Sequence, residues 1–175
     1  DAFIVLKDAD LEKAAKIAVK SRMNNCGQTC ISAKRIIVDE SVAGHFTQLL
    51  SNEIDRLKIG DPLDPETEIS TLARPDLVEN LERQVSSSIK ADALEIIKGG
   101  RDNGKSNFFK PCLLTNINPS MAVYKEEVFG PVAMVMTFKD EKEAVEMAND
   151  SKYGLGAAVW SKDLERAEKI GLKLE

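Results

Sequence analysis

Cys30 is the residue of this sequence best suited to covalent chemistry. It follows a predicted helix and closes a polar stretch, Asn-Asn-Cys-Gly-Gln-Thr-Cys, at positions 24–30. A cysteine attacks through its thiolate, which needs backbone amides, a helix end or a cation nearby. Lys34 and Arg35 could supply that charge, and Gly27 would let the main chain approach a substrate closely. The alternative is that Cys30 is a small buried residue without reactivity.

The remaining cysteines and the single histidine do not suggest a second catalytic group. Cys26, Cys30 and Cys112 lack the spacing of a zinc site, so no metal is expected. His45 falls inside a predicted helix, where we expect a surface or boundary position, and no Cys–His pair is evident. Cys26 could be a redox partner of Cys30 only if a loop brought the two sulfurs together; otherwise it is a structural or incidental thiol.

A rival chemistry is offered by residues 99–106, Gly-Gly-Arg-Asp-Asn-Gly-Lys-Ser, which satisfy the pattern of a phosphate-binding loop. That mechanism requires a helix to begin at Lys105 and Ser106. The following residues, 107–112, look extended and include Pro111, so a nucleotide hydrolase is the less favoured interpretation. The Rossmann fingerprint is also absent, because Val159 stands where a third glycine would follow Gly154 and Gly156.

Strands and helices alternate along most of the chain. The patterns predict strands at 3–6, 35–38, 94–97, 132–138 and 155–160, an extended stretch at 108–117, and helices at 11–23, 41–58, 75–91, 141–149 and 163–174. Such alternation predicts an α/β fold with a mostly parallel sheet flanked by helices. Residues 94–138 contain strands without helices between them, so we expect a partly mixed sheet or an edge strand there.

Length and charge narrow the class of protein. The 175 residues fit one domain, and 24 basic against 29 acidic residues argue against a nucleic-acid partner. No apolar run approaches the roughly 20 residues that cross a bilayer. The first residues do not resemble a signal peptide and the cysteine count is odd, so we expect a cytoplasmic protein. Both ends look cut, the first within a strand and the last within a helix.

Three blocks of sequence resemble the aldehyde dehydrogenase family. Residues 27–35, Gly-Gln-Thr-Cys-Ile-Ser-Ala-Lys-Arg, are similar to the signature that introduces the nucleophile of that family. Residues 126–132, Glu-Glu-Val-Phe-Gly-Pro-Val, and 149–155, Asn-Asp-Ser-Lys-Tyr-Gly-Leu, resemble two further segments. Residues 2–6 and 8–11 are also similar to the segment that comes after the Glu-Leu-Gly-Gly motif of the family. The resemblance covers essentially the whole chain, in the right order.

The resemblance implies roles for three residues. Cys30 would be the nucleophile that converts an aldehyde to a thiohemiacetal, and its own N–H would contribute to the oxyanion hole. Glu127 would bind the nicotinamide ribose hydroxyls, and Phe129 would pack near the same part of the cofactor. Hydride transfer to NAD or NADP would leave a thioester, which water hydrolyses to the acid.

The resemblance also implies that residues 1–175 are a catalytic domain truncated at both ends. The general-base glutamate, the asparagine of the oxyanion hole and the cofactor-binding domain would precede Asp1. An oligomerisation strand would follow Glu175, and the intact enzyme would be a homo-oligomer. We therefore expect the isolated chain to bind cofactor poorly and to lack dehydrogenase activity.

The expected substrate is an aldehyde, and the wording around Cys30 resembles that of succinate-semialdehyde dehydrogenases. Some of these enzymes carry an arginine six residues before the nucleophile to pair with the substrate carboxylate. That position here is Asn24, and Arg22 is displaced by two residues. A dehydrogenase that passes the thioester to coenzyme A, and a non-catalytic assembly domain, remain alternatives.

Overall fold

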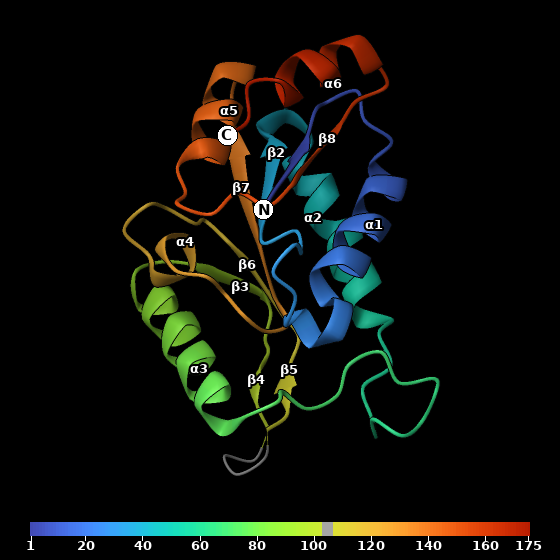
Figure 1. Cartoon of the computed structure of the whole chain (residues 1–175), viewed down its shortest axis with the longest axis vertical. Helices are drawn as coiled ribbons and strands as arrows, with labels where there is room; N and C mark the ends of the chain where they lie inside the picture. Colours follow the sequence, from blue (N-terminus) through green and yellow to red (C-terminus); the bar gives the residue numbers. More distant parts are fainter. Residues whose placement is uncertain (103–106) are drawn as a thin grey trace.

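The described residues form a central six-stranded sheet (Figure 1). The computed structural model describes residues 1–102 and 107–175. The strands of this sheet are β1 (Ala2–Val5), β2 (Arg35–Asp39), β3 (Leu94–Ile97), β6 (Cys112–Thr115), β7 (Val132–Phe138) and β8 (Ala157–Trp160). Their order is β3-β6-β7-β2-β1-β8, and only β3, at one edge, pairs antiparallel with its neighbour. The predicted mostly parallel, partly mixed sheet is confirmed.

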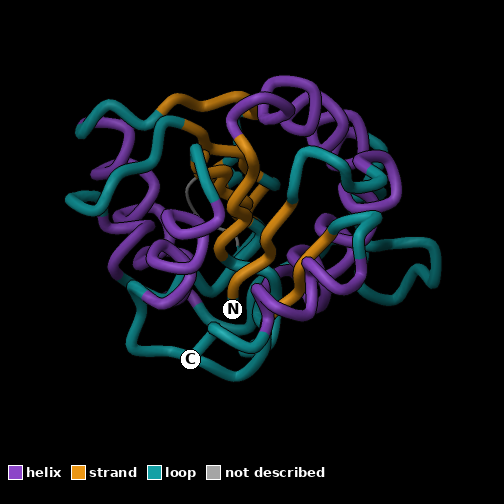
Figure 2. Tube along the Cα trace, turned by 90° about the horizontal axis from the view of Figure 1, so that it is seen from above, coloured by secondary structure: helices purple, strands orange, loops and turns teal. Residues whose placement is uncertain are grey.

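Helices cover both faces of this sheet (Figures 1 and 2). The helices are α1 (Leu11–Met23), α2 (Glu40–Asp55), α3 (Pro75–Lys90), α4 (Ala122–Lys125), α5 (Glu141–Asn149) and α6 (Leu164–Gly171). Successive side chains of a strand point to opposite faces. Phe3 and Val5 accordingly pack with α1 and α2, whereas Ile4 and Leu6 pack on the side of α3 to α6. The core is therefore two apolar layers separated by the sheet.

The described residues in and directly after the predicted phosphate-binding loop contain two short strands, which pair antiparallel. These strands are β4 (Gly100–Arg101) and β5 (Phe109–Lys110). Lys105 and Ser106 lie outside the described residues. Phe108 bridges to Thr71, and β5 follows directly, so residues 107–112 contain no helix. The phosphate-binding interpretation lacks the helix that its mechanism requires.

Several element boundaries differ from those that the sequence predicts. Helix α2 ends three residues early, β8 begins at Ala157, and α6 covers only Leu164–Gly171. The sequence patterns did not predict α4 or the 3-10 turn η1 (Asn24–Gly27). Asp10 caps α1 as expected, whereas Asp8 accepts hydrogen bonds from Ser161 and Lys162 and ties the start of α1 to β8.

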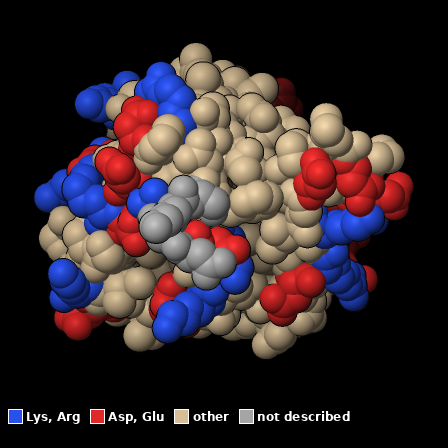
Figure 3. Space-filling view, turned by 90° about the horizontal axis from the view of Figure 1, so that it is seen from below, with Lys and Arg blue, Asp and Glu red and all other residues tan. Residues whose placement is uncertain are grey.

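The surface carries charges of both signs. In the view of Figure 3, Lys and Arg side chains lie beside Asp and Glu side chains on both flanks of the molecule. Among the described residues, no helix is both long and apolar enough to span a membrane.

Candidate active site

The chain reverses sharply between α1 and β2 in a turn that carries Cys30. Asn25, Cys26 and Gly27 have φ values of 51°, 55° and 74°, three consecutive residues in the left-handed region. Only glycine adopts this region without a steric cost, although asparagine tolerates it better than most residues. The turn from Asn24 to Ser32, here called the nucleophile turn, must therefore be held by contacts with its surroundings.

The first of these contacts is a close approach of two main chains. A Cβ atom at Gly27 would lie 2.1 Å from the carbonyl oxygen of Gly130, closer than any real contact. Gly130 belongs to the block at Glu126 to Val132, which we call the cofactor segment after the role that its sequence resemblance implies. We expected Gly27 to let the main chain approach a substrate. Instead, the space beside Gly27 is occupied by the main chain of the cofactor segment.

A buried arginine joins the same two segments. Arg22 in α1 has no exposed surface. Its five guanidinium hydrogens are donated to the carbonyl oxygens of Gly27, Val128, Gly130 and Val132 and to the Ser32 hydroxyl. Burial lowers the pKa of Arg22 to about 10, while the nearby Glu127 opposes this shift, so the group stays protonated at neutral pH. Arg22 has no donor left for a substrate carboxylate.

Loop residues support the other side of the nucleophile turn. The Ser70 amide donates to the sulfur of Cys26 at 3.2 Å, and the Ala73 amide donates to the Gln28 side chain at 2.9 Å. Cys26 is buried in this contact. The sulfur of Cys26 therefore has a structural partner, which favours a structural role over a redox role.

Cys30 differs from the other cysteines in its exposure. Cys30 is exposed, whereas Cys26 and Cys112 are buried. Burial, with a smaller contribution from Glu95, raises the pKa of Cys112 to about 12. Among the described residues, Cys30 is thus the one free thiol that a reagent in solution can reach without unfolding.

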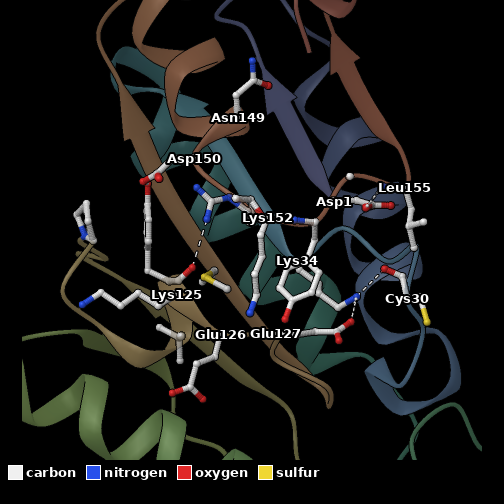
Figure 4. A pocket seen from close by; sticks show the side chains of 18 residues that line it. Asp1, Cys30, Lys34, Lys125, Glu126, Glu127, Asn149, Asp150, Lys152 and Leu155 are labelled. Carbon is white, nitrogen blue, oxygen red and sulfur yellow. Dashed lines mark hydrogen bonds and ion pairs between the residues drawn. The ribbon is translucent and has the colours of Figure 1, made fainter. Parts of the chain in front are cut away.

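Cys30 and Glu127 line one cavity of about 930 Å³ (Figure 4). The Glu127 side chain is 35% exposed and lies on the cavity wall. Its neighbour Glu126 is instead bound by Arg83 and Gln84 of α3, and Gln84 also donates to the main-chain oxygen of Glu127. Both glutamates border the cavity, but the Glu126 carboxylate is bonded to α3, whereas the Glu127 carboxylate is not.

Lys34 lies between Cys30 and Glu127. Its ammonium group donates to the carbonyl oxygens of Thr29 and Cys30, at 2.8 Å and 2.6 Å, and is 3.0 Å from a carboxylate oxygen of Glu127. Phe129 is half-buried and does not line the cavity, and its ring centre lies 5.9 Å from the same ammonium. The positive charge expected near Cys30 is present, but its hydrogen bonds are to main-chain oxygens.

The third sequence block lines the same cavity. Residues 149–155 line it together with Tyr124, whose hydroxyl donates to Asp150 at 2.6 Å. Burial and this hydrogen bond raise the pKa of Tyr124. Arg35 stacks over the Tyr124 ring at 4.3 Å and donates to the Tyr124 and Met147 carbonyl oxygens, so it braces the wall. All three blocks that resemble one family thus meet at one cavity.

Arg22, Tyr124 and Asp150 are parts of this site to which the sequence patterns assign no role. Arg22 carried a weak signal, because it lies on the same helix face as Ala15, Ala18 and Val19, which are buried. An arginine on an apolar helix face is expected to have a specific partner. Tyr124 and Asp150 carried no comparable signal.

The geometry of Cys30, Glu127 and the cavity is that expected of an enzyme that forms a covalent bond to its substrate. An exposed cysteine that lines the same cavity as a carboxylate, at the edge of an α/β sheet, is suited to covalent chemistry on a small molecule.

The family follows from comparison with known proteins. A sequence model of the aldehyde dehydrogenase family matches residues 1–175, and the chain belongs to that family. It is 41% identical over 175 residues to the succinate semialdehyde dehydrogenase [NAD(P)+] Sad of Escherichia coli K12, covering all of this chain and 38% of Sad. It is 44% identical over 170 residues to a probable succinate-semialdehyde dehydrogenase [NADP(+)] of Synechocystis, covering 97% of this chain and 37% of that protein.

Solved structures agree with the sequence comparison. The structure of Gox0499, from work on its cofactor and substrate selection, superposes on this chain with a TM-score of 0.95 at 43% sequence identity. The match covers all of this chain and 38% of the Gox0499 chain. The chain therefore spans less than two fifths of the length of the relatives that it matches.

The exposure of the cysteines predicts selective labelling. Iodoacetamide at neutral pH should modify Cys30 at least about tenfold faster than Cys112, because the thiolate reacts and Cys112 is buried with a raised pKa. Peptide mass spectrometry after timed quenching measures both rates, and labelling in denaturant gives the unfolded control. Equal native rates would contradict an accessible Cys30.

The Arg22 contacts predict a large loss of stability on substitution. Arg22→Met removes five buried hydrogen bonds and should lower the free energy of unfolding by about 3 kcal/mol or more. Urea unfolding followed by circular dichroism measures the change. Arg56→Met, which removes a largely exposed arginine paired with Glu53, is the matched control and should change stability by about 0.5 kcal/mol at most. Similar losses for both variants would refute the assigned role of Arg22.

Proposed function

We propose that this chain supplies the nucleophile-bearing part of an NAD(P)-dependent aldehyde dehydrogenase, which oxidises an aldehyde to a carboxylic acid. The observation that carries the proposal is the exposed Cys30 on the same cavity as Glu127, with Lys34 between them. Family membership supports the reaction type, and the names of the E. coli and Synechocystis relatives support the cofactor.

The proposed chemistry begins at the Cys30 sulfur. The thiolate forms a bond to the aldehyde carbon, and the carbonyl π electrons move to the oxygen, giving a thiohemiacetal. The negative charge that develops on that oxygen needs a donor fixed in advance. By resemblance to the family, the Cys30 amide would be this donor. The contacts that hold the nucleophile turn would keep this amide from reorienting during the reaction.

The residues present fit a nicotinamide cofactor beside this sulfur. The Glu127 carboxylate is partly exposed on the cavity wall, and its ion pair with Lys34 leaves further lone pairs to accept the hydroxyls of a ribose. Phe129 is half-buried next to the same lysine and would pack near the cofactor. When bound, the cofactor would supply the acceptor for the hydride of the thiohemiacetal.

The remaining steps would need groups that the family resemblance assigns to other segments of a longer polypeptide. A thioester on Cys30 is cleaved when water attacks its carbonyl carbon and the sulfur departs as thiolate. We propose that other segments of the longer polypeptide supply three things: the general base for that water, the rest of the cofactor-binding domain and the contacts of a homo-oligomer. Cytoplasmic location is proposed on the same basis.

We propose a semialdehyde as the substrate class because the E. coli and Synechocystis relatives are named for succinate semialdehyde. The nucleophile turn itself does not provide the carboxylate partner. Arg22 is buried, and Asn24 is exposed with its amide directed to Thr29. Recognition of a carboxylate would therefore come from residues outside this turn.

Substitution of the nucleophile tests the reaction type. In the full-length enzyme, Cys30→Ser should lower kcat by roughly a thousandfold or more, because a serine hydroxyl without an activating base is a poor nucleophile. Cys26→Ser, which retains an acceptor for the Ser70 amide, should stay within about threefold of the wild type. Steady-state formation of NADH or NADPH measures both variants. Near-normal turnover by Cys30→Ser would refute the proposed mechanism, and acid formed without coenzyme A would separate hydrolysis from acyl transfer.

A pair of matched aldehydes tests the substrate class. Succinate semialdehyde and butanal have the same carbon chain and differ in the terminal carboxylate. We expect kcat/KM to be at least about tenfold higher for the semialdehyde, which corresponds to about 1.4 kcal/mol of transition-state binding. Equal values, or a preference for butanal, would contradict the semialdehyde proposal and leave the dehydrogenase proposal intact.

A further inference from the structure

The ammonium group of Lys34 is shared between the nucleophile turn and the cofactor segment. A lysine has three N–H donors. Two are directed at the carbonyl oxygens of Thr29 and Cys30, and the third faces the carboxylate of Glu127. The Lys34 side chain is only 8% exposed, so water competes weakly for these donors. Figure 4 shows Lys34 between Cys30 and Glu127 on the cavity wall.

From this arrangement we propose that Lys34 is a positioning residue that fixes the Glu127 carboxylate for the cofactor and, through the same ammonium, the main chain of Cys30. This inference rests on the proposed function, because it assumes that Glu127 binds a nicotinamide ribose. It adds a link between the two halves of the site, which the roles of Cys30 and Glu127 alone do not contain.

The Glu127 side chain is the part of the site that most needs such a link. Gln84 holds the main chain of Glu127, while the carboxylate is 35% exposed and would otherwise rotate among several rotamers. Ordering a long side chain on ligand binding weakens that binding. Lys34 holds the carboxylate in advance, and its contact with the Phe129 ring orients a second cofactor-segment residue.

Arg22 does not substitute for Lys34 in this role. Arg22 joins the same two segments, but through main-chain oxygens and the Ser32 hydroxyl. Loss of Arg22 would loosen the segments as a whole. Loss of Lys34 would release one functional carboxylate and the carbonyl oxygen of the nucleophile, which predicts a specific effect on cofactor binding.

A double-mutant cycle on the full-length enzyme tests this role. Lys34→Met and Glu127→Gln are made singly and together, and the Kd for NAD⁺ and for NADP⁺ is measured by calorimetry. We expect each single change to weaken binding of the preferred nucleotide by about tenfold. In the Glu127→Gln background, Lys34→Met should add no more than about threefold, because the group through which it acts is already altered. Lys169→Met removes a lysine that is ion-paired with Glu165 on α6 and should leave Kd unchanged.

A second measurement tests whether Lys34 also affects Cys30. The rate of carboxamidomethylation of Cys30 is measured with and without saturating nucleotide. In the wild type the nucleotide should change this rate by at least about threefold, and Lys34→Met should reduce that difference to less than about half. Thermal unfolding of every variant is recorded first. If Lys34→Met does not fold, Lys34→Gln, which retains donors for the two carbonyls, replaces it in the cycle.

The outcomes separate this inference from the proposed function. Multiplicative losses in the double variant, or an unchanged Kd in Lys34→Met, would overturn the role of Lys34 while leaving the dehydrogenase proposal standing. A wild-type enzyme that binds neither nucleotide would overturn both. A Kd loss that disappears in the Glu127→Gln background, together with a Cys30 rate that no longer responds to nucleotide, supports the link.

Discussion

The site depends first on the buried guanidinium of Arg22. Burying a charge is costly unless every hydrogen-bonding position is satisfied. Arg22 meets this condition without a hydrogen-bonded carboxylate, because its five donors match five oxygens in a planar fork that lysine could not provide. Four of these oxygens are carbonyls from two segments about a hundred residues apart in sequence. One side chain of α1 thus makes the nucleophile turn and the cofactor segment a single unit.

The glycines of the two segments are required by the same constraint. Gly27 approaches Gly130 so closely that neither turn nor segment could shift to admit a side chain, since Arg22 is bonded to both carbonyl oxygens. On its other side, Gly130 packs against Leu81 of α3, where a Cβ would lie 2.2 Å from the leucine side chain. The cofactor segment is therefore confined between α3 and the nucleophile turn, which leaves Glu127 directed to the cavity.

The sequence predicts those features of the structure that depend on the pattern of neighbouring residues along the chain. Period-two and helical patterns identify the strands and helices, and the run of strands after residue 94 correctly indicates a mixed edge, because β3 pairs antiparallel with β6. Residues 99–106 satisfy a phosphate-binding pattern although Gly100, a described glycine of that pattern, belongs to the β4–β5 strand pair, because glycines occur in many kinds of backbone. The family resemblance singles out Cys30, Glu127 and Phe129. The resemblance does not predict the hydrogen bonds of Arg22, because their acceptors are mainly main-chain carbonyl oxygens. Every residue has such an oxygen, so a sequence pattern cannot identify which ones are bonded.

The electrostatics of Cys30 follow from the edge of the sheet on which it lies. The cavity adjoins Arg35, at the start of β2, and Leu155, just before β8, so it is at the amino edge of the parallel strands. Doubly wound sheets usually bind ligands at the carboxyl edge, where helix N-termini offer positive potential. Here the helix end near Cys30 is instead the C-terminal end of α1, which opposes an anion.

Buried cations offset that unfavourable potential. The nucleophile turn adds further carbonyl oxygens, and Arg22 and Lys34 donate to those of Gly27, Thr29 and Cys30. Each carbonyl that is bonded in this way contributes less negative potential at the sulfur. The two buried cations therefore act on the surroundings of Cys30 through its main chain, by compensating the carbonyl oxygens that they contact.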